Sequence, residues 1–358
     1  MKKNAIIAMS GGVDSSVAAA LMLEHGFHCA GITFELFQGK SSSNFSCSNA
    51  SCSTPIEDAR SVAFNLGMEH FVINLTEEFD KQVVQRFVKI YEQGDTPNPC
   101  IDCNRRIKFN MGLFRTPGLP QFDYLATGHY ARVKYDEVSG RYLLQKALDN
   151  KKDQSYVLYS LSQQQLEKIK FPLGELSKDE VRKIAEEKKL ASANKKESQD
   201  ICFVPDGDYS NFIEEYTGKK YPCGDIIDTE GKKIGRHQGI IRYTIGQRRG
   251  LGVAANIPVY VTAKSAADNT VTLGPEDALY SKSLTAKDIN LIACADLKKA
   301  MRVMVKTRYL QEAQSAVAEQ TGENILYIEF DKPQRAITPG QAAVLYDGDI
   351  VVGGGTIS

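Results

Sequence analysis

The feature that most constrains the fold lies near the N-terminus, where an apolar run leads into two adjacent glycines. Residues 5–9 read Ala-Ile-Ile-Ala-Met, residues 10–16 read Ser-Gly-Gly-Val-Asp-Ser-Ser, and a helix-like stretch covers 17–24. This order predicts a buried strand, a tight turn and a helix. Adjacent glycines let a backbone approach an anion closely, and the free N–H groups and positive dipole end of the new helix point at it. The segment therefore favours binding of a pyrophosphate group.

The spacing excludes two common phosphate-binding loops. No Lys follows the glycines where the usual ATPase loop requires one, and the turn does not read G-x-G-x-x-G. It resembles the SGGxDS signature of the PP-loop ATP pyrophosphatases, which cleave ATP between the α and β phosphates and transfer AMP to a carbonyl oxygen. The alternative is an ordinary strand-to-helix turn in which Asp14 or Ser15 caps the helix.

Length and charge indicate a multidomain enzyme without a strong net charge. The chain has 358 residues, and domains of about 100 to 200 residues predict two or three of them. Lys plus Arg and Asp plus Glu each number 44, so a nucleic-acid surface would have to come from local clusters. The first apolar run is too short for a secretory signal, and no run approaches the roughly 20 residues of a membrane span. We expect a cytoplasmic protein with no membrane partner.

Strands and helices are expected to alternate through the first third of the chain. Residues 29–37, 71–75 and 124–126 read as further strands, and residues 54–67 and 77–92 read as helices. Such alternation predicts a parallel sheet whose ligand site lies at the carboxyl ends of the strands.

The remainder of the chain changes character. A charged helix is expected over 177–190 and a short strand carrying Cys202 over 198–203, whereas beyond 218 Gly-rich turns separate short alternating runs. The predicted fold class is α/β, with an N-terminal PP-loop parallel-sheet domain (adenine nucleotide alpha hydrolase-like), a small β-containing central domain and a C-terminal β-barrel. The boundaries are placed at 1–215, 216–280 and 281–358.

Two basic clusters lie in the later domains. Residues 232–249 hold six Lys or Arg and no acid, with His237 and Tyr243 interleaved, and residues 297–310 hold five and no acid. Such clusters suggest a phosphate-tracking surface, and the aromatic rings allow base stacking. Two solvated faces without a ligand are an equally good explanation.

Eight cysteines in a chain of this length suggest thiol chemistry or a metal site before a disulfide framework. Cys100 and Cys103 form a C-x-x-C pair, and Cys202 lies far along the chain. One hypothesis is a four-thiolate zinc site completed by Cys47 and Cys52. The other is delivery of sulfur to a carbonyl that the PP-loop has adenylated.

A series of motifs runs in order along essentially the whole chain, and it is similar to that of the tRNA-specific 2-thiouridylase (MnmA) family. The motifs lie at 10–16, 96–104, 107–109, 127–132, 152–156, 198–203, 244–252 and 339–341. The resemblance implies ATP-dependent thiolation of C2 of the wobble uridine in the tRNAs for Lys, Glu and Gln. It also implies that the central domain binds tRNA.

The resemblance further implies a route for the sulfur. AMP would be transferred to uracil O2, a poor leaving group, while Mg²⁺ and the loop amides carry the pyrophosphate charge. Cys202 would receive sulfur as a persulfide from a cysteine desulfurase or sulfur-relay protein. Cys103 would be the nucleophile that assists its release, leaving a Cys103–Cys202 disulfide. Both thiolates are needed, so depressed thiol pKa values near Lys or Arg are expected.

Two sets of binding residues follow from the same resemblance. Contacts with ATP are expected at Ala8, Met9, Ser10, Gly11, Gly12, Val13, Asp14, Ser15, Phe34 and Gly128. Contacts with tRNA are expected at Asn98, Pro99, Cys100, His129, Lys152, Asp153, Gln154, Arg308, Tyr309 and Gln341. Residues 98–100 would meet the target base, which must be splayed out of the anticodon stack.

Cys100 departs from the family pattern, in which many members have an Asp that acts as general base. That role cannot be transferred to Cys100, and Asp102 is only a candidate for it. Cys100, Cys103 and Cys202 could instead hold a [4Fe-4S] cluster with one iron open to sulfide. The persulfide route needs only two thiols and is slightly favoured.

Two functions of other classes are weaker hypotheses. An amidating PP-loop synthetase gives no role to the separated cysteines, and a zinc-stabilised RNA-binding protein gives none to residues 10–16.

Overall fold

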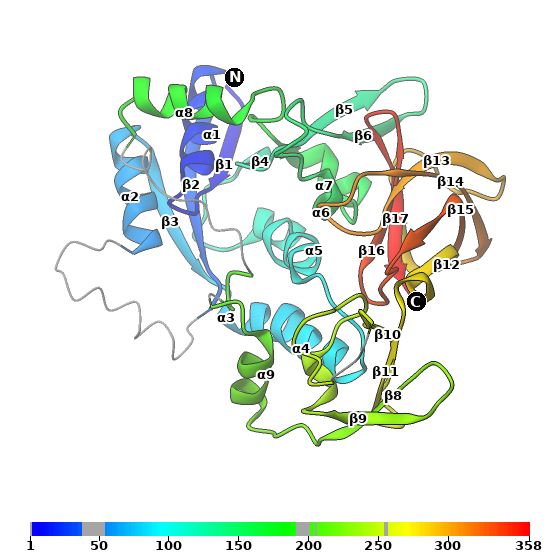
Figure 1. The fold of residues 1–358 in the computed structure, drawn as a ribbon. Coiled ribbons are helices and arrows are strands. Elements are labelled where there is room, and N and C mark those ends of the chain that lie inside the picture. Colours follow the sequence, from blue (N-terminus) through cyan, green and yellow to red (C-terminus); the bar gives the residue numbers. More distant parts are fainter. Residues whose placement is uncertain (1, 38–53, 191–200, 205, 254–256) are drawn as a thin grey trace.

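The computed structural model describes residues 2–37, 54–190, 201–204, 206–253 and 257–358. Figure 1 shows an α/β region that holds the N-terminus, a small sheet region at one end of the molecule, and a β-barrel that holds the C-terminus. The predicted fold class is confirmed.

A five-stranded sheet in the order β3-β2-β1-β4-β7 forms the centre of the N-terminal region. Its strands are β1 (Asn4–Ala8), β2 (His28–Glu35), β3 (Glu69–Asn74), β4 (Tyr124–Thr127) and β7 (Ile169–Lys170). All four pairings are parallel, and Ile6 and Ile7 on opposite faces of β1 are both buried. The order reverses at β1, so the binding crevice of such a sheet is expected where β1, β2 and β4 end.

Three helices lie together beside this sheet: α1 (Val13–Glu24), α2 (Pro55–Asn65) and α8 (Lys178–Glu187) (Figure 1). Two of them begin with a capping box, formed by Thr54 with Glu57 and by Ser177 with Glu180. In each box the hydroxyl accepts the N3 amide and the carboxylate accepts the N-cap amide. The helix starts predicted at these positions are confirmed.

A helical segment connects β3 to β4. The predicted helix over 77–92 is one continuous rod made of α3 (Thr76–Phe79), a π turn (Asp80–Val84) and α4 (Gln85–Glu92). It is followed by α5 (Pro99–Cys103), a second π turn (Asn104–Lys108) and a 3₁₀ turn (Met111–Arg115). In the second π turn the Phe109 amide donates to the Asn104 carbonyl at 3.1 Å, five residues back. π turns often mark functional sites because they redirect side chains within a helix.

The chain then crosses to the other regions through a hairpin and short helices. They are β5 (Arg132–Asp136), β6 (Arg141–Gln145), α6 (Ser155–Leu158), α7 (Gln163–Lys168) and, after the turn at Cys202, α9 (Tyr209–Thr217). The central sheet has the order β10-β11-β8-β9. Its strands are β8 (Gly224–Ile227), β9 (Lys233–His237), β10 (Tyr260–Ser265) and β11 (Thr270–Gly274), with 3₁₀ turns at Ile240–Arg242 and Glu276–Leu279.

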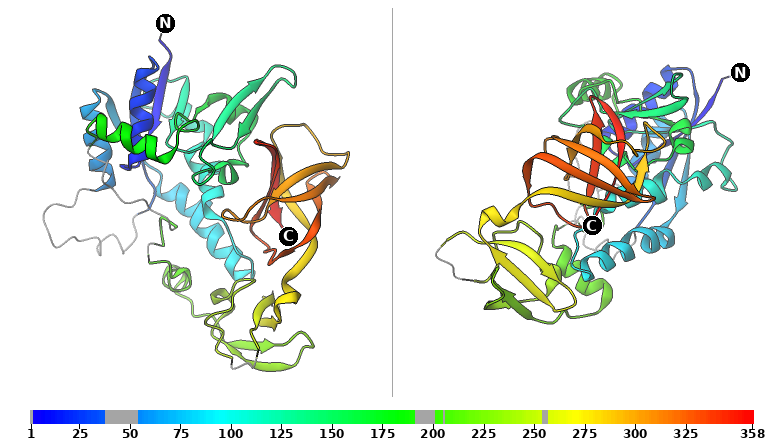
Figure 2. Two further views of the ribbon diagram at one scale, coloured as in Figure 1. Left: turned by 45° about the horizontal axis from the view of Figure 1, so that its top comes forward. Right: turned by 90° about the vertical axis from the view of Figure 1, so that its right-hand side faces the viewer.

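Six antiparallel strands close the C-terminal barrel, which Figure 2 shows from two sides. They are β12 (Tyr280–Leu291), β13 (Met301–Lys306), β14 (Gln314–Gly322), β15 (Ile325–Arg335), β16 (Ala342–Asp347) and β17 (Ile350–Ile357). Closure comes from pairing of β12 with β17, and alternate residues such as Val303 and Val305 fill the interior. On the outside, Ile350 of β17 pairs with Gln145 of β6, which joins the barrel to the N-terminal region.

The strand predicted at 198–203 is wrong for the described part of that segment. Residues 201–204 form a turn in which the Val204 amide donates to the Ile201 carbonyl at 2.8 Å. Phe203 is buried beside Phe87, at 5.2 Å between ring centroids. Tertiary packing of the aromatic ring, and not strand pairing, therefore explains the apolar pattern.

In the described residues, no helix is long and apolar enough to cross a membrane.

Replacing Ser177 by Ala is expected to lower the free energy of unfolding by about 1 kcal/mol, because the first turn of α8 loses its capping box. Chemical denaturation would measure the change. Ser177→Thr is the control, since it keeps the hydroxyl and should stay close to wild type. Equal stability of the Ala variant and wild type would contradict a role for this cap.

Candidate active site

The turn after β1 packs closely against the first turn of α2 and leads into a helix without a side-chain cap. Gly11 has a φ of 72°, and a Cβ there would stand 2.6 Å from the Pro55 carbonyl oxygen. Gly12 is the N-cap of α1 and brings no capping side chain. The first amides of a helix need an acceptor from elsewhere. An uncapped helix N-terminus of this kind is a common anion-binding element, and pyrophosphate binding at this turn stays a prediction.

Two serines hold this turn in place. Ser15 Oγ accepts the Ser10 amide at 3.1 Å and donates to the Gly12 carbonyl at 3.1 Å. Ser16 Oγ donates to the same carbonyl at 2.9 Å. Because both hydroxyls bond within the turn, their role in the observed structure is to shape the loop.

The other predicted nucleotide contacts gather at the same edge of the sheet. Ala8 pairs with Ile32 on one side and with Thr127 on the other, so Phe34 and Gly128 lie just beyond the end of β1. A Cβ on Gly128 would stand 2.7 Å from the Asp14 carbonyl carbon. Met9 is fixed by Thr33, whose hydroxyl donates to the Met9 carbonyl at 2.9 Å. Val13 is buried in the first turn of α1. Residues 8–15, 34 and 128 are thus brought together.

A lysine that the motif analysis missed reaches this loop. Lys178, the first residue of α8, is only 7% exposed and donates from Nζ to Asp14 Oδ1 at 2.7 Å. The Tyr130 hydroxyl donates to the same oxygen at 2.8 Å. The ammonium balances the charge of a partly buried carboxylate. No local pattern predicts this pair, because Lys178 begins a charged helix of a kind typical of a solvated surface.

Cys103 and Cys202 lie at one site although about a hundred residues separate them in sequence. Cys103 is buried on α5 in the same apolar cluster as Phe203, the residue after Cys202. Cys100, one helical turn before Cys103, and Cys202 reach solvent, and both are free thiols. The three thiols influence one another electrostatically.

Burial dominates the pKa values of these thiols. Desolvation raises the pKa of Cys103 to about 12 and also raises the pKa of Cys100 and Cys202. The ammonium of Lys108 lowers all three, but its effect is smaller. The expected depression of the thiol pKa values is therefore wrong for this conformation, because the surrounding protein desolvates the thiolates. Lys108, at the end of the π turn, belongs to the motif at 107–109, but no role at the thiols was predicted for it.

The candidate base Asp102 is engaged by two arginines. Its Oδ1 lies 3.2 Å from Nε of Arg106 and 3.3 Å from Nε of Arg86. In the described part of the chain, no group of three or more His, Cys, Asp or Glu side chains is arranged to hold a metal ion. Cys47 and Cys52, named for a zinc site, lie outside the described residues.

His129 lies between the nucleotide loop and the thiols as a neutral side chain. Its Nδ1 is 2.7 Å from Thr127 Oγ1, and its ring centroid is 5.6 Å from that of Phe109. Burial, with a smaller contribution from Lys108, lowers the pKa of His129 to about 3. At neutral pH this imidazole can offer a hydrogen bond to tRNA but no charge.

The residues predicted at 152–154 largely bond within the protein. The buried Asp153 carboxylate accepts the Ala147 amide at 3.0 Å and the Ser155 hydroxyl at 2.8 Å. Gln154 exchanges two hydrogen bonds with the Tyr130 backbone, each 2.9 Å. Lys152 is partly exposed. Contact of these residues with tRNA stays a prediction, and the structure adds that Asp153 and Gln154 brace the site from within.

The barrel residues predicted to touch tRNA also connect domains. Arg308 Nη2 donates to the Ala336 carbonyl at 3.0 Å and to the Ile245 carbonyl of the central region at 3.2 Å. Burial raises the pKa of Tyr309, and smaller electrostatic contributions come from Asp153 and Cys100, so Tyr309 lies near the thiols. Gln341 bonds to the segment before Asn98 and Pro99, whose backbone leads into α5.

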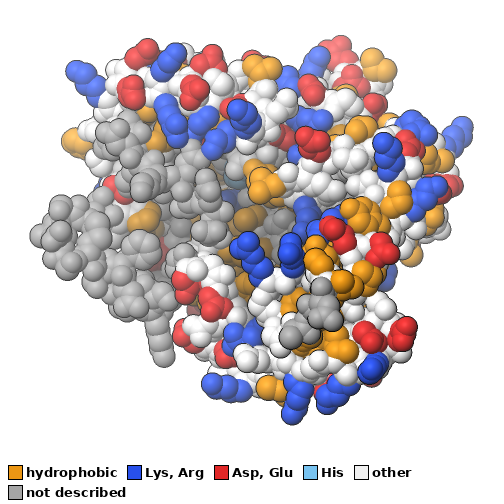
Figure 3. All heavy atoms as spheres, viewed as in Figure 1, with side chains coloured by type: hydrophobic (Ala, Val, Ile, Leu, Met, Phe, Trp, Pro, Cys, Tyr) orange, Lys and Arg blue, Asp and Glu red, His pale blue; other side chains and the backbone are white. Residues whose placement is uncertain are grey.

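The basic clusters are less available than composition suggested. His237 and Tyr243 are 0% and 4% exposed, so the expected base stacking on them is wrong in this structure: both rings pack into the central domain. Arg242 pairs with Glu214 at 2.8 Å and Arg302 with Asp331 at 2.8 Å. Figure 3 shows Lys and Arg side chains over the visible face with acidic ones among them. Acids distant in sequence thus offset part of each cluster.

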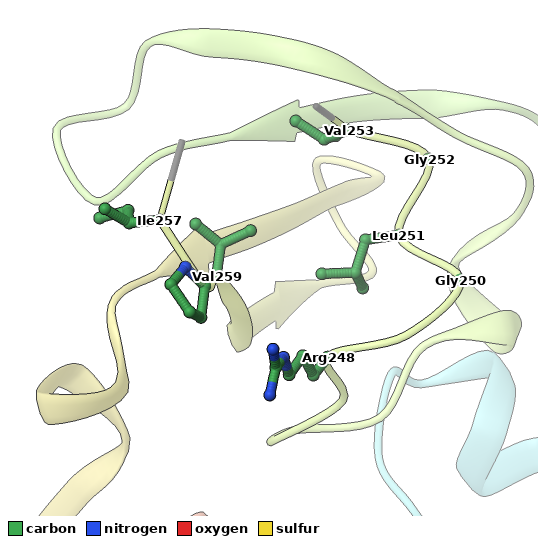
Figure 4. A pocket seen from close by; sticks show the side chains of 8 residues that line it. Arg248, Gly250, Leu251, Gly252, Val253, Ile257 and Val259 are labelled. Carbon is green, nitrogen blue, oxygen red and sulfur yellow. The ribbon is translucent and has the colours of Figure 1, made fainter. Parts of the chain in front are cut away.

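The central domain also has a pocket of about 490 Å³ next to the 244–252 motif (Figure 4). Arg248 and apolar residues such as Leu251 and Val259 line it.

Comparison with known proteins covers nearly the whole chain. Residues 3–206 match the family model described as tRNA methyl transferase HUP domain, residues 210–275 the tRNA methyl transferase PRC-barrel domain, and residues 281–357 the aminomethyltransferase beta-barrel domain. A tRNA-specific 2-thiouridylase MnmA from Acetivibrio thermocellus is 47% identical over 357 residues, which is 99% of each chain. One from Clostridioides difficile is 45% identical over 357 residues, covering 100% of this chain and 98% of its own.

The chain belongs to the tRNA-specific 2-thiouridylase family. The resemblance drawn from its motifs is confirmed. Assignment of the individual site residues and of the boundaries 1–215, 216–280 and 281–358 stays a prediction.

Gly128→Ala is expected to destabilise this 2-thiouridylase family member by about 1–3 kcal/mol, because the added methyl would meet the Asp14 backbone and force β4 away from α1. Chemical denaturation would measure the free energy of unfolding. Gly322→Ala is the matched control, since its Cβ would meet only Ile325 at ordinary contact distance. Equal stability of both variants would contradict close packing at Gly128.

The thiols are expected to differ in their rate of alkylation. With its pKa raised to about 12, Cys103 should have little thiolate at pH 8 and react about tenfold faster for each unit of pH up to that value. Exposed Cys202 should react sooner. Lys108→Gln should slow all three sites, because the cation that lowers their pKa is removed. Mass spectrometry after iodoacetamide pulses would measure the rates, and fast labelling of Cys103 at pH 7 would contradict the raised pKa.

Proposed function

We propose that this chain is an ATP-dependent tRNA 2-thiouridylase that adenylates O2 of the wobble uridine and then transfers sulfur to C2. The observation that carries the proposal is the similarity of 45–47% identity to MnmA proteins over the full length. It is supported by the glycine turn at Gly11 and Gly12, which leaves the N-terminus of α1 without a side-chain cap, and by two thiols at a common site.

In the first half of the reaction, uracil O2 would attack the α phosphate of ATP. An O–P bond forms to AMP and pyrophosphate leaves. The amides at the start of α1 suit the charge on the phosphates. Lys178 and Tyr130 both bond to Oδ1 of Asp14, so Mg²⁺ would be held through Oδ2 of that carboxylate. Mg²⁺ when bound supplies further charge stabilisation. Gly128, which lacks a side chain and so lets the end of β4 approach the Asp14 backbone, would border the nucleotide at the same edge of the sheet.

In the second half, a persulfide on Cys202 would attack C2 through its terminal sulfur, and AMP would leave with O2. The Cys103 thiolate then attacks Sγ of Cys202, so the S–S bond to the new thiouridine breaks and a Cys103–Cys202 disulfide forms. A dithiol reductant restores both thiols. Because burial keeps Cys103 protonated in the structure, its proton has to be removed once tRNA is bound.

The proposed partners are the tRNAs for Lys, Glu and Gln and a persulfide donor, either a cysteine desulfurase or a sulfur-relay protein, in the cytoplasm. The residues proposed to touch tRNA are those named above at 98–100, 129, 152–154, 308, 309 and 341, with the central domain. A route through a [4Fe-4S] cluster is the second candidate, and it is favoured only by the third thiol at Cys100. Iron content and activity of Cys100→Ser separate the two, because loss of both would contradict the persulfide route.

An anaerobic assay with unmodified tRNA, ATP, Mg²⁺ and a persulfide donor, namely a cysteine desulfurase supplied with cysteine, tests the proposal. Thiolated tRNA is retarded on a mercury-containing gel, and the retarded band should require ATP. Asp14→Ala should abolish tRNA-dependent pyrophosphate release, and Cys103→Ser should abolish thiolation while release continues. Normal pyrophosphate release by Asp14→Ala would refute the assigned loop. Release without thiolation in wild type would leave adenylation supported and the sulfur route wrong.

A further inference from the structure

The barrel turn at 339–341 binds residues 96 and 97, which lead into α5, the helix that carries Cys103. Gln341 Nε2 donates to the Thr96 carbonyl at 2.9 Å and to the Pro97 carbonyl at 3.0 Å. The Thr96 amide donates to the Pro339 carbonyl at 2.9 Å. A Cβ on Gly340 would stand 2.8 Å from the Thr96 carbonyl oxygen, so the two backbones touch. A side chain and two backbones therefore join regions that are 244 residues apart.

The gripping turn is itself fixed to the barrel wall. The Gly340 amide donates to the Ile357 carbonyl at 2.9 Å, and the Ile357 amide returns a bond to the Gln341 carbonyl at 2.8 Å. Tyr156 adds a bond from its hydroxyl to the Ala342 carbonyl at 3.0 Å. The Gln341 amide is thus presented from a rigid element, which is what precise placement of a neighbouring loop requires.

The gripped segment has no regular structure of its own between α4 and α5. It ends at Asn98, the N-cap of α5, which carries no side-chain capping bond. The direction of α5, and with it the position of Cys103, therefore depends on how the preceding carbonyls are held.

We propose that Gln341 is a positioning residue, whose amide fixes the Thr96–Pro97 carbonyls and thereby aligns the Cys103 helix with the target base. The inference rests on the proposed thiouridylase function and adds a second role to a residue that the family resemblance assigns to tRNA contact. A positioning residue acts on the chemical step, whereas a residue that only contacts tRNA acts on binding.

Two substitutions separate these roles. Gln341→Met keeps the length of the side chain but cannot donate, and Gln341→Lys keeps a donor of similar reach. Positioning predicts that Met lowers kcat for thiolation about tenfold or more with KM for tRNA nearly unchanged, and that Lys restores much of kcat. A pure tRNA contact predicts a raised KM for Met with kcat retained, and this result would overturn the proposal.

Hydrogen exchange of the protein without tRNA or ATP gives a readout that needs no activity. Peptides covering 95–104 should exchange several-fold faster in Gln341→Met than in wild type, while barrel peptides stay unchanged. Gln314→Met, on β14 of the same barrel, is the control and should leave 95–104 unaffected. Unchanged exchange in Gln341→Met would overturn the proposal. If wild type fails to thiolate tRNA, the proposed function is lost, but exchange still decides whether Gln341 holds this segment.

Discussion

The close contact between the end of β4 and the first turn of α1 is the constraint on which the site depends. It places the Tyr130 hydroxyl against Asp14. The Tyr130 amide in turn donates to Oε1 of Gln154, and the Tyr130 carbonyl accepts the Gln154 amide. Two further hydrogen bonds follow. The Gln154 carbonyl accepts the Val157 amide at 3.1 Å, and the Val157 carbonyl accepts the Asn104 side-chain amide at 3.1 Å. Asn104 follows Cys103. A continuous path of hydrogen bonds thus connects the nucleotide turn to the buried thiol.

The thiol at the end of this path is stable but unreactive as it stands. Burial of Cys103 favours the neutral thiol, and the nearby Lys108 offsets only part of that effect. His129 is neutral for the same reason. Burial of a thiol slows its oxidation, and it makes reaction depend on what changes around the sulfur. Cys202 is exposed on a turn packed by Phe203, which suits its proposed role as the first thiol to meet a sulfur donor.

The barrel and the central domain contribute structure to this site as well as surface. Arg308 bonds across to Ile245, and the 339–341 turn grips Thr96. Both contacts come from short loops between barrel strands. The positions of the barrel and the central domain relative to the N-terminal region therefore hold the segment before α5 in place. The motifs at 96–104, 244–252 and 339–341 are thus connected through the barrel although they are distant in sequence.

The sequence by itself determined the elements whose signals are local. The glycine pair predicts a tight turn before the first helix. The capping boxes at Thr54 and Ser177 mark the starts of two further helices, and period-two alternation predicts the strands of the barrel. It also indicated which thiols matter. Only the tertiary structure decided what surrounds them. Four features depend on residues far away in the chain. They are the pairing of Lys178 with Asp14, the burial that raises the pKa of Cys103, the turn at Cys202 and the burial of His237 and Tyr243. Desolvation and ion pairing arise from what packs around a group in three dimensions, and no local pattern encodes that.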